Sequence, residues 1–222
     1  PIYTCGNSYT AARLGDHCSA AIGDANLKGV RNFDIEKAYE AMRKNAFESP
    51  ANKKDYQNGM GRRALQSYLK YGYIPLEDSV PDAFHTKEQV SRTLEYAYDD
   101  FVLSQVAKQL QKNEDYKLLS VRALNYRNVI DPQTGYAQGR HTDGTFLKEQ
   151  NAFQFAKFIT EGAPCHYTWY VPHDPYGLME YMGGKEEFAL KLDSMFSEHR
   201  YWHGNEPCHQ VAFMFNYAGE PW

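Results

Sequence analysis

The sequence predicts a mainly α-helical fold assembled from antiparallel helix pairs. Apolar residues recur at intervals of three and four in several long segments, which is the repeat of an amphipathic helix. No segment alternates apolar and polar residues for long enough to build a sheet. No linker rich in Ser, Pro or Gly divides the 222 residues. We therefore expect one domain of helices with long connections between them.

Three helices are expected in the first third of the chain, over residues 16–30, 34–47 and 59–72. Asp34 stands immediately before the second apolar repeat, where its carboxylate can cap the unpaired N–H groups of a helix N-terminus. Gly72 ends the third repeat, and glycine readily adopts the left-handed backbone that is common at helix C-termini.

The longest apolar repeat lies in the middle of the chain and predicts a helix over residues 87–110. One face of this helix carries Val90, Leu94, Ala97 and Phe101. After a short break, a second helix over residues 113–130 is expected. Its apolar face consists of Leu119, Ala123, Tyr126 and Ile130.

Two more helices are expected near the C-terminus, over residues 184–196 and 207–219. The first places Phe188, Leu192 and Met195 on one face. The second begins with Pro207 at the first helical position, where no backbone N–H is needed, and ends at Gly219.

Between residues 131 and 182 the helical repeat is lost. Residues 131–146 are rich in turn-forming types, and residues 161–177 are rich in aromatic residues and proline. Long irregular loops in a compact domain are functional more often than not. We therefore expect functional side chains in this part of the chain.

Composition argues against several classes of function. The net charge of −4, with no basic stripe, argues against nucleic acid as a partner. No apolar run is long enough to span a membrane. Aromatic residues make up 15% of the sequence, and such rings either face sugars or fill the gaps between helices. The four cysteines have no zinc-finger spacing.

The first candidate catalytic residue is Glu161, in the segment ITEGAPCHYTWYVPHD. Tyr167, Trp169 and Tyr170 follow it closely, and apolar surroundings disfavour an ionised carboxylate. The pKa of Glu161 would then be raised, so that its carboxyl keeps a proton for a leaving group at neutral pH. The alternative is a structural glutamate at a loop corner, bonded to backbone amides.

A second candidate site is the segment RYWHGNEPCHQ. Asn205 and Glu206 offer hard oxygen ligands, which suit Ca²⁺ better than a softer metal. His203 and His209 flank Pro207, which prevents the regular helix that a zinc-protease motif requires. The alternative is a capped helix start, with Asn205 or Glu206 as the cap.

Charged side chains also gather in the segment SRTLEYAYDDF. Glu95 and Asp99 lie one helical turn apart and repel each other unless a base lies nearby. For Arg92, an ion pair between helices is preferred over contact with a ligand. The loop GRHTDGTF is either a ligand-binding loop or a surface turn. Cys165 adjoins His166, but adjacency in sequence rarely gives the geometry of a thiolate–imidazole pair.

Five blocks, taken in order, cover nearly the whole chain. They are LGDHCSAAIGDANLKGVRNFDIEKAYEAMRKNAF, SRTLEYAYDDF, NYRNVIDPQTGYAQGRHTDGTF, ITEGAPCHYTWYVPHDPYGLMEYMGGKEEFALKLDSMF and YWHGNEPCHQVAFMFNYAGEPW. Together they resemble glycoside hydrolase family 92, the calcium-dependent exo-α-mannosidases. The resemblance implies an (α/α)₆ toroid, of which residues 1–222 would form a central part of the catalytic domain. The β-sandwich and the general-base segment of the family are expected upstream and downstream of these residues.

The resemblance also implies roles for individual residues. Glu161 aligns with the general acid of the family, and the HGNEP block aligns with its calcium and substrate site. His203 and Gly204, together with His166, are then expected to contact substrate. Asn205 and Glu206 are expected to bind Ca²⁺.

The implied enzyme is an inverting exo-α-mannosidase that removes terminal mannose from glycans. Its expected partners are a mannose-containing glycan and the remaining parts of the same enzyme. Its expected location is secreted, periplasmic or at the cell surface. Without the general base, these residues alone are expected to be a very poor catalyst. A rival interpretation is a non-catalytic carbohydrate-binding or structural role.

Two positions depart from the family pattern. Many relatives have Trp where this chain has Cys165, and Gly or Ser where it has Cys208. If both blocks line one pocket, the resemblance makes these cysteines neighbours that could form a disulfide. The missing Trp also changes the leaving-group side of the pocket, so the mannoside linkage is not predicted.

Overall fold

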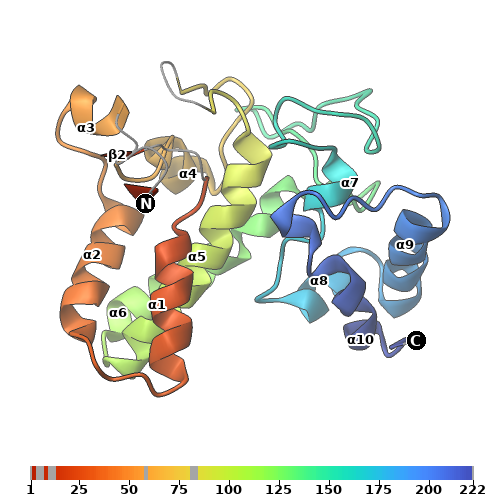
Figure 1. Ribbon diagram of the computed structural model, residues 1–222. Coiled ribbons are helices and arrows are strands. Elements are labelled where there is room, and N and C mark those ends of the chain that lie inside the picture. Colours follow the sequence, from red (N-terminus) through yellow and green to blue (C-terminus); the bar gives the residue numbers. More distant parts are fainter. Residues whose placement is uncertain (1, 4–7, 10–13, 58–59, 81–84, 222) are drawn as a thin grey trace.

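The computed structural model describes residues 2–3, 8–9, 14–57, 60–80 and 85–221, and these residues are mainly helical (Figure 1). The α-helices are α1 (His17–Leu27), α2 (Ile35–Phe47), α3 (Lys53–Gln57), α4 (Leu65–Tyr71), α5 (Gln89–Gln109), α6 (Asn113–Arg122), α7 (Pro164–Tyr167), α8 (Pro175–Tyr181), α9 (Lys185–Ser197) and α10 (Phe215–Ala218). The 3₁₀ helices are η1 (Ala123–Val129), η2 (Glu206–Cys208) and η3 (Val211–Met214). Two short strands, β1 (Ile2–Tyr3) and β2 (Ser8–Tyr9), pair antiparallel with Ile2 opposite Tyr9. The mainly α prediction is confirmed.

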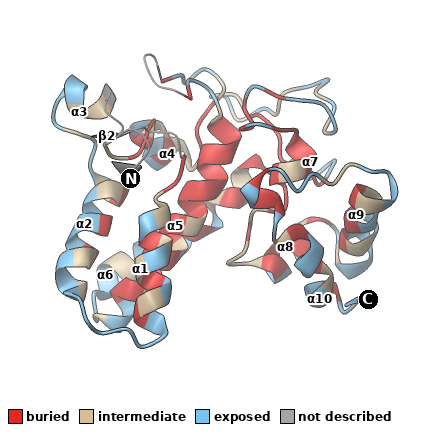
Figure 2. Ribbon diagram, viewed as in Figure 1, coloured by how far each residue is buried: buried red, intermediate tan, exposed pale blue. Residues whose placement is uncertain are grey.

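Helix α5 is the centre of the fold. Helices α1, α2 and α6 pack against it on one side, and the C-terminal elements α7 to α10 lie on the other side (Figure 1). Figure 2 shows that α5 is buried over most of its length. A helix enclosed by neighbours on all sides cannot be strictly amphipathic, so the polar side chains of α5 must find partners inside the protein. No helix in the described ranges is both long enough and apolar enough to cross a membrane.

Several helix ends confirm the local signals in the sequence. The Asp34 carboxylate accepts a hydrogen bond from the Lys37 N–H (3.0 Å) and caps α2. Gly72 ends α4 with a φ of 73°, the left-handed conformation expected for it. The predicted helix over 87–110 corresponds to α5, with Val90, Leu94 and Ala97 fully buried.

Other predicted boundaries are wrong. The helix expected over 113–130 is α-helical only to Arg122 and continues as the 3₁₀ helix η1, although its predicted apolar face is buried. The helix expected over 207–219 is divided into η2, η3 and α10, and only its end at Gly219 is as predicted. Helix α8 was not expected. Its signals are Asp174, which caps it by accepting a bond from the Gly177 N–H (3.0 Å), and Pro175 at the first helical position.

Three apolar clusters hold the described helices together, and one of them joins α4 to α5 through Leu65, Tyr68 and Tyr96. A small cluster joins α2, α5 and α6 and includes Met42, Leu103 and Leu119. A large cluster joins the other side of α5 to the loops and helices of the C-terminal half. Phe188, Leu192 and Met195, the predicted apolar face of α9, are all fully buried in the large cluster.

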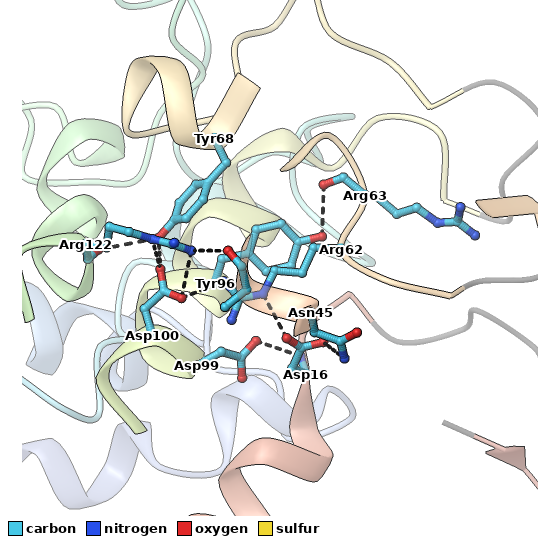
Figure 3. Close-up of polar contacts among 10 residues, drawn as sticks. Asp16, Asn45, Arg62, Arg63, Tyr68, Tyr96, Asp99, Asp100 and Arg122 are labelled. Atoms are coloured by element: carbon cyan, nitrogen blue, oxygen red, sulfur yellow. Dashed lines mark hydrogen bonds and ion pairs between the residues drawn. The ribbon is translucent and has the colours of Figure 1, made fainter. Parts of the chain in front are cut away.

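A buried ionic cluster crosses the first half of the molecule (Figure 3). The Asp100 carboxylate of α5 is fully buried and accepts bonds from Arg122 (Nε to Oδ2, 2.7 Å) and Arg62 (Nη1 to Oδ1, 2.6 Å). Arg62 also binds Asp16 (2.8 Å), and the Tyr68 hydroxyl donates to Asp100 (3.0 Å). This cluster therefore ties the start of α1, the segment before α4, and α6 to one carboxylate of α5.

The ion pair between helices predicted for Arg92 is made by other residues. Arg92 is buried, but it donates to the backbone carbonyls of Lys87 (2.6 Å) and His85 (2.5 Å) in the segment just before α5. Among the described residues, Asp100 of α5 pairs with Arg122 of α6 and with Arg62 in the segment before α4, and Arg43 of α2 pairs with Asp115 of α6. The loop GRHTDGTF is a turn in which Asp143 accepts a bond from the Thr145 N–H (2.9 Å), as expected for a surface turn.

The surroundings of Asp99 explain how α5 tolerates Glu95 and Asp99 one turn apart. Its carboxyl is fully buried and accepts a hydrogen bond from the Asp16 N–H (2.6 Å). Burial raises its pKa well above the ordinary value, and the charges of Asp16 and Glu95 raise it further. The raised pKa favours the neutral form of Asp99, and this form is not repelled by Glu95.

Replacing Asp100 by Asn should strongly destabilise the protein. Arg62 and Arg122 would then be buried without their shared carboxylate, which costs about 3–5 kcal/mol. Urea unfolding measures this cost. The matched control is Asp24→Asn, which removes an exposed pair with Lys28 (2.8 Å) and should cost less than about 1 kcal/mol. Equal losses in the two variants would contradict the role given to Asp100.

Candidate active site

The loop that carries Glu161 rests on the N-terminus of α5. The Phe158 carbonyl accepts a bond from the Val90 N–H (3.0 Å), and the Thr160 N–H donates to the Ser91 hydroxyl (2.9 Å). The first turn of a helix leaves unpaired N–H groups and the loop satisfies some of them. The position of Glu161 is therefore set by the central helix of the fold.

Glu161 itself lies at a sharp corner of this loop. Its φ is 53°, in the left-handed region that a residue with a side chain rarely adopts. The residue is exposed. Gly162 follows, and a Cβ at this position would lie 2.8 Å from the His166 Nδ1. A larger residue at 162 would thus displace either the corner or the imidazole.

The structure brings the Glu161 loop and the HGNEP block together. Asn205 is 3% exposed, and its side-chain amide donates to the Thr160 carbonyl (3.4 Å), one residue before Glu161. Further along, the Gln210 amide donates to the Trp169 carbonyl (3.0 Å). The two segments predicted to carry function are therefore neighbours, although about forty residues separate them in sequence.

His166 connects the same two segments through its ring. The Ala163 N–H donates to Nδ1 (3.1 Å), and Nε2 lies 3.1 Å from the Arg200 carbonyl, to which it can only donate. Both nitrogens of the neutral ring are thus engaged by the backbone. Burial lowers the pKa of His166, which favours this neutral form. The contacts favour a positioning role, and the predicted substrate contact of His166 stays a prediction.

His203 and Gly204 lie on the exposed side of the HGNEP block. His203 Nδ1 is 2.6 Å from the Tyr201 hydroxyl, and its ring stacks on His209 with centroids 4.4 Å apart. The indole of Trp202 lies against Gly204, where a Cβ would overlap it. Both predicted substrate residues are exposed. Their contact with substrate stays a prediction.

Asn205 and Glu206 differ in their surroundings. Asn205 is buried and precedes η2, but its side chain does not cap that helix, so this part of the structural alternative is wrong. Pro207 is the second residue of η2, which begins at Glu206, and not the first helical residue as predicted. Glu206 is exposed. Within the described residues, no group of three or more His, Cys, Asp or Glu side chains is arranged to hold a metal.

The apolar enclosure expected around the Glu161 carboxyl is wrong in part. Trp169 is fully buried, and its ring packs edge-on against Phe188 (5.2 Å between centroids) in the core. Tyr167 is also buried, and its pKa is raised mainly by burial, with smaller contributions from the charges of Glu95 and Glu161. Glu161 is therefore exposed, whereas Tyr167 and Trp169 are buried in the core.

Glu95 of α5 belongs to the same region. Burial raises the pKa of both Tyr167 and Tyr170, and the negative charge of Glu95 is the next largest cause for each. His17 Nε2 lies 3.7 Å from Glu95 Oε2. The acidic residue Glu95 was singled out in the sequence, but its proximity to Tyr167 and Tyr170 depends on the tertiary fold and has no local signal.

Cys165 and Cys208 are both free and buried, whereas Cys18 is free and exposed. Cys5 lies outside the described residues. Burial raises the pKa of Cys165 to about 11, so little thiolate exists at neutral pH. This agrees with the low expectation for Cys165 as a nucleophile.

The chain resembles known proteins along its whole length. The model of the glycosyl hydrolase family 92 catalytic domain matches residues 1–222. A family GH92 α-mannosidase of Bacteroides thetaiotaomicron is 39% identical over 95% of this chain and 27% of its own length, with a TM-score of 0.81. A family GH92 inverting mannosidase of the same organism is 30% identical over 96% of this chain and 30% of its own, with a TM-score of 0.83.

A curated relative shows the same pattern. An uncharacterized secreted glycosidase of Arthroderma benhamiae is 28% identical over 93% of this chain and 29% of its own length. The chain thus spans less than a third of the length of each of these three relatives.

The buried histidines should make folding stability depend on pH. Burial lowers the pKa of both His166 and His173 below the ordinary value of 6.5. As the pH falls below about 6.5, the unfolded chain takes up protons that the folded chain does not. The contribution to stability is therefore complete above this pH and declines as the pH falls toward the folded-state pKa values.

Urea unfolding between about pH 7.5 and pH 5 tests this dependence. The free energy of unfolding should depend less steeply on pH in the His166→Gln variant, because Gln takes up no proton. His199→Gln is the control, since His199 is exposed. If the slope is as steep in His166→Gln as in the His199→Gln control, the neutral, buried state of His166 is disproved.

Proposed function

Because this chain belongs to glycosyl hydrolase family 92, we propose that it supplies the general acid and part of the calcium site of an inverting exo-α-mannosidase. The substrate is a glycan with a terminal α-linked mannose. The 39% identical relative is an α-mannosidase and the 30% identical relative is an inverting mannosidase, which supports both parts of the proposal. Because the chain spans less than a third of each relative, the activity of the whole protein is part of the proposal.

One observation supports this proposal more than any other. The buried Asn205 amide binds the Thr160 carbonyl, so an exposed carboxyl and a block of oxygen ligands come to one place. Glu161 and Asn205 have no local reason to be neighbours. A sugar bound over Asn205 and Glu206 would have Glu161 beside it.

In this proposal Glu161 gives its proton to the glycosidic oxygen as the bond to mannose breaks. Inversion also needs a base that activates water on the opposite face of the sugar, with about 6.5–9.5 Å between the two carboxyl groups. We assign none of the carboxylates of this chain to the base. Enclosure of Glu161 by bound substrate would disfavour its ionised form and so promote proton transfer.

The donors at positions 205 and 206 fit calcium in chemistry. An amide oxygen and a carboxylate are hard ligands of the kind that Ca²⁺ prefers, and calcium takes about 6–8 of them. Two adjacent residues supply only some of these ligands, and sugar hydroxyls or water can complete the set. Bound calcium would draw electron density from the sugar hydroxyl oxygens that contact it. Asn205 and Glu206 would hold it beside the Glu161 loop.

The remaining predicted residues divide into two roles. His203 and Gly204 are exposed and are proposed to contact the sugar. His166 is proposed to position Glu161, because its ring binds the Ala163 N–H and faces the Arg200 carbonyl. A secreted location is proposed because the Arthroderma benhamiae relative is a secreted glycosidase.

Replacing Glu161 by Gln should lower kcat for an unactivated α-mannoside by about 10²–10⁴-fold, the usual contribution of a general acid. The loss should be much smaller for an aryl mannoside whose leaving group needs no proton. Steady-state kinetics on the intact protein measures both. Glu149→Gln is the matched control, because Glu149 is also an exposed loop glutamate with a positive φ, of 67°.

The two outcomes of this experiment separate the candidate functions. Equal activity of the Glu161→Gln and Glu149→Gln variants would exclude Glu161 as the acid. Binding of a mannoside without any release of mannose by the unsubstituted protein would favour the non-catalytic carbohydrate-binding role.

Chelation of calcium should abolish mannose release, and added Ca²⁺ should restore it. Asn205→Ala should raise the calcium concentration for half-maximal activity by about tenfold or more, since one ligand and a buried hydrogen bond are lost. Asn32→Ala is the control at an exposed asparagine. Activity that withstands exhaustive chelation would refute the calcium role.

A further inference from the structure

Two hydrogen bonds fix the position of the HGNEP segment relative to the Glu161 segment. The Asn205 amide donates to the Thr160 carbonyl (3.4 Å), and the Gln210 amide donates to the Trp169 carbonyl (3.0 Å). Cys165 stands between residues 160 and 169, and Cys208 stands between residues 205 and 210. The bonds therefore bracket the two cysteines where α7 packs against η2.

Both thiols lie in the same apolar cluster. Cys165 is 1% exposed and Cys208 is 0% exposed. Burial raises the pKa of each thiol to about 11, and the charge of Cys165 adds to the effect on Cys208. Both side chains therefore belong to the part of the core where α7 packs against η2.

We propose that Cys165 and Cys208 are a dithiol pair that an external disulfide oxidises to an internal disulfide, which would join the Glu161 segment to the HGNEP segment. Three observations support this pair. Two hydrogen bonds join the segments on either side of the cysteines, α7 packs on η2, and both thiols lie in the same apolar cluster. Cys18 is not a competing partner, because it lies on α1, which is on the other side of α5 from α7 (Figure 1).

The chemistry is a two-electron exchange with a low-molecular-weight disulfide such as oxidised glutathione. One cysteine thiolate attacks a sulfur of that disulfide, a mixed disulfide forms, and one small thiolate leaves. The second cysteine thiolate then attacks the mixed disulfide and releases the second small thiolate. The two protons lost by Cys165 and Cys208 end on the two released thiols. The cysteine pair is oxidised and the small disulfide is reduced.

Burial decides when this exchange takes place. Thiols with a pKa of about 11 are poor nucleophiles in the folded protein at neutral pH, because little thiolate is present. The exchange is therefore fast in the folding chain, before α7 and η2 close over the thiols. Once formed, the bond is enclosed by the core and resists reductant.

The direct test is a peptide map of the intact protein folded in a glutathione redox buffer. Free thiols are alkylated in denaturant, the protein is digested without reductant, and the peptides are analysed by mass spectrometry. We expect a linked species that contains the Cys165 and Cys208 peptides and is two hydrogen masses lighter than their sum. We expect an alkylated Cys18 peptide. This test needs no variant, so a failure of a variant to fold does not affect it.

Thermal unfolding provides a second readout. A bond closing a loop of this length should raise the midpoint by roughly 5–10 °C relative to protein kept in reductant. Cys165→Ser and Cys208→Ser should each remove both the linked species and this difference. Cys18→Ser should retain both. Neither mass nor thermal midpoint requires substrate, so these results are independent of the proposed activity.

Quantitative alkylation of both Cys165 and Cys208 in the oxidised sample would overturn the proposal. So would a linked species in which either of them is joined to Cys18 or Cys5.

Discussion

The fold depends on one buried carboxylate, Asp100 of helix α5. Arg62 and Arg122 both bind it, and Arg62 continues the network to Asp16 at the start of α1 (Figure 3). Buried charges are tolerated only when paired with good geometry, so these contacts fix the relative positions of several segments at once. The apolar clusters supply most of the burial, whereas Asp100 determines which arrangement of the helices pairs the buried charges of Arg62 and Arg122.

The same helix carries the candidate site at its N-terminus. Ser91 and Val90 bind the loop that precedes Glu161, and Asn205 binds that loop from the C-terminal half. Glu161 is thus held in an uncommon backbone conformation by contacts from two directions. Such conformations persist where the surroundings determine them, and they occur at functional sites. The position of the carboxyl follows from the packing around α5 rather than from the local sequence.

The sequence predicts the local features well and the long-range ones less well. Asp34, Gly72 and the apolar face of α9 were predictable because capping and helical periodicity act within a few residues. The break at Arg122 and the division of 207–219 depend on tertiary packing. The exposure of Glu161 was missed because Trp169, near it in sequence, is used in the core. The meeting of Glu161 and Asn205 came only from the family resemblance, since no local pattern places them together.

The central claim is that the Glu161 loop and Asn205 form one catalytic unit. A double-mutant cycle tests it most directly. We would measure kcat/KM for the calcium-dependent hydrolysis of an α-mannoside by the unsubstituted protein, by Glu161→Gln, by Asn205→Ala and by the double variant. Residues that act in one unit give strongly non-additive losses. We predict that kcat/KM of the double variant is about equal to that of the less active single variant. Losses that add, as for two independent sites, would contradict the account.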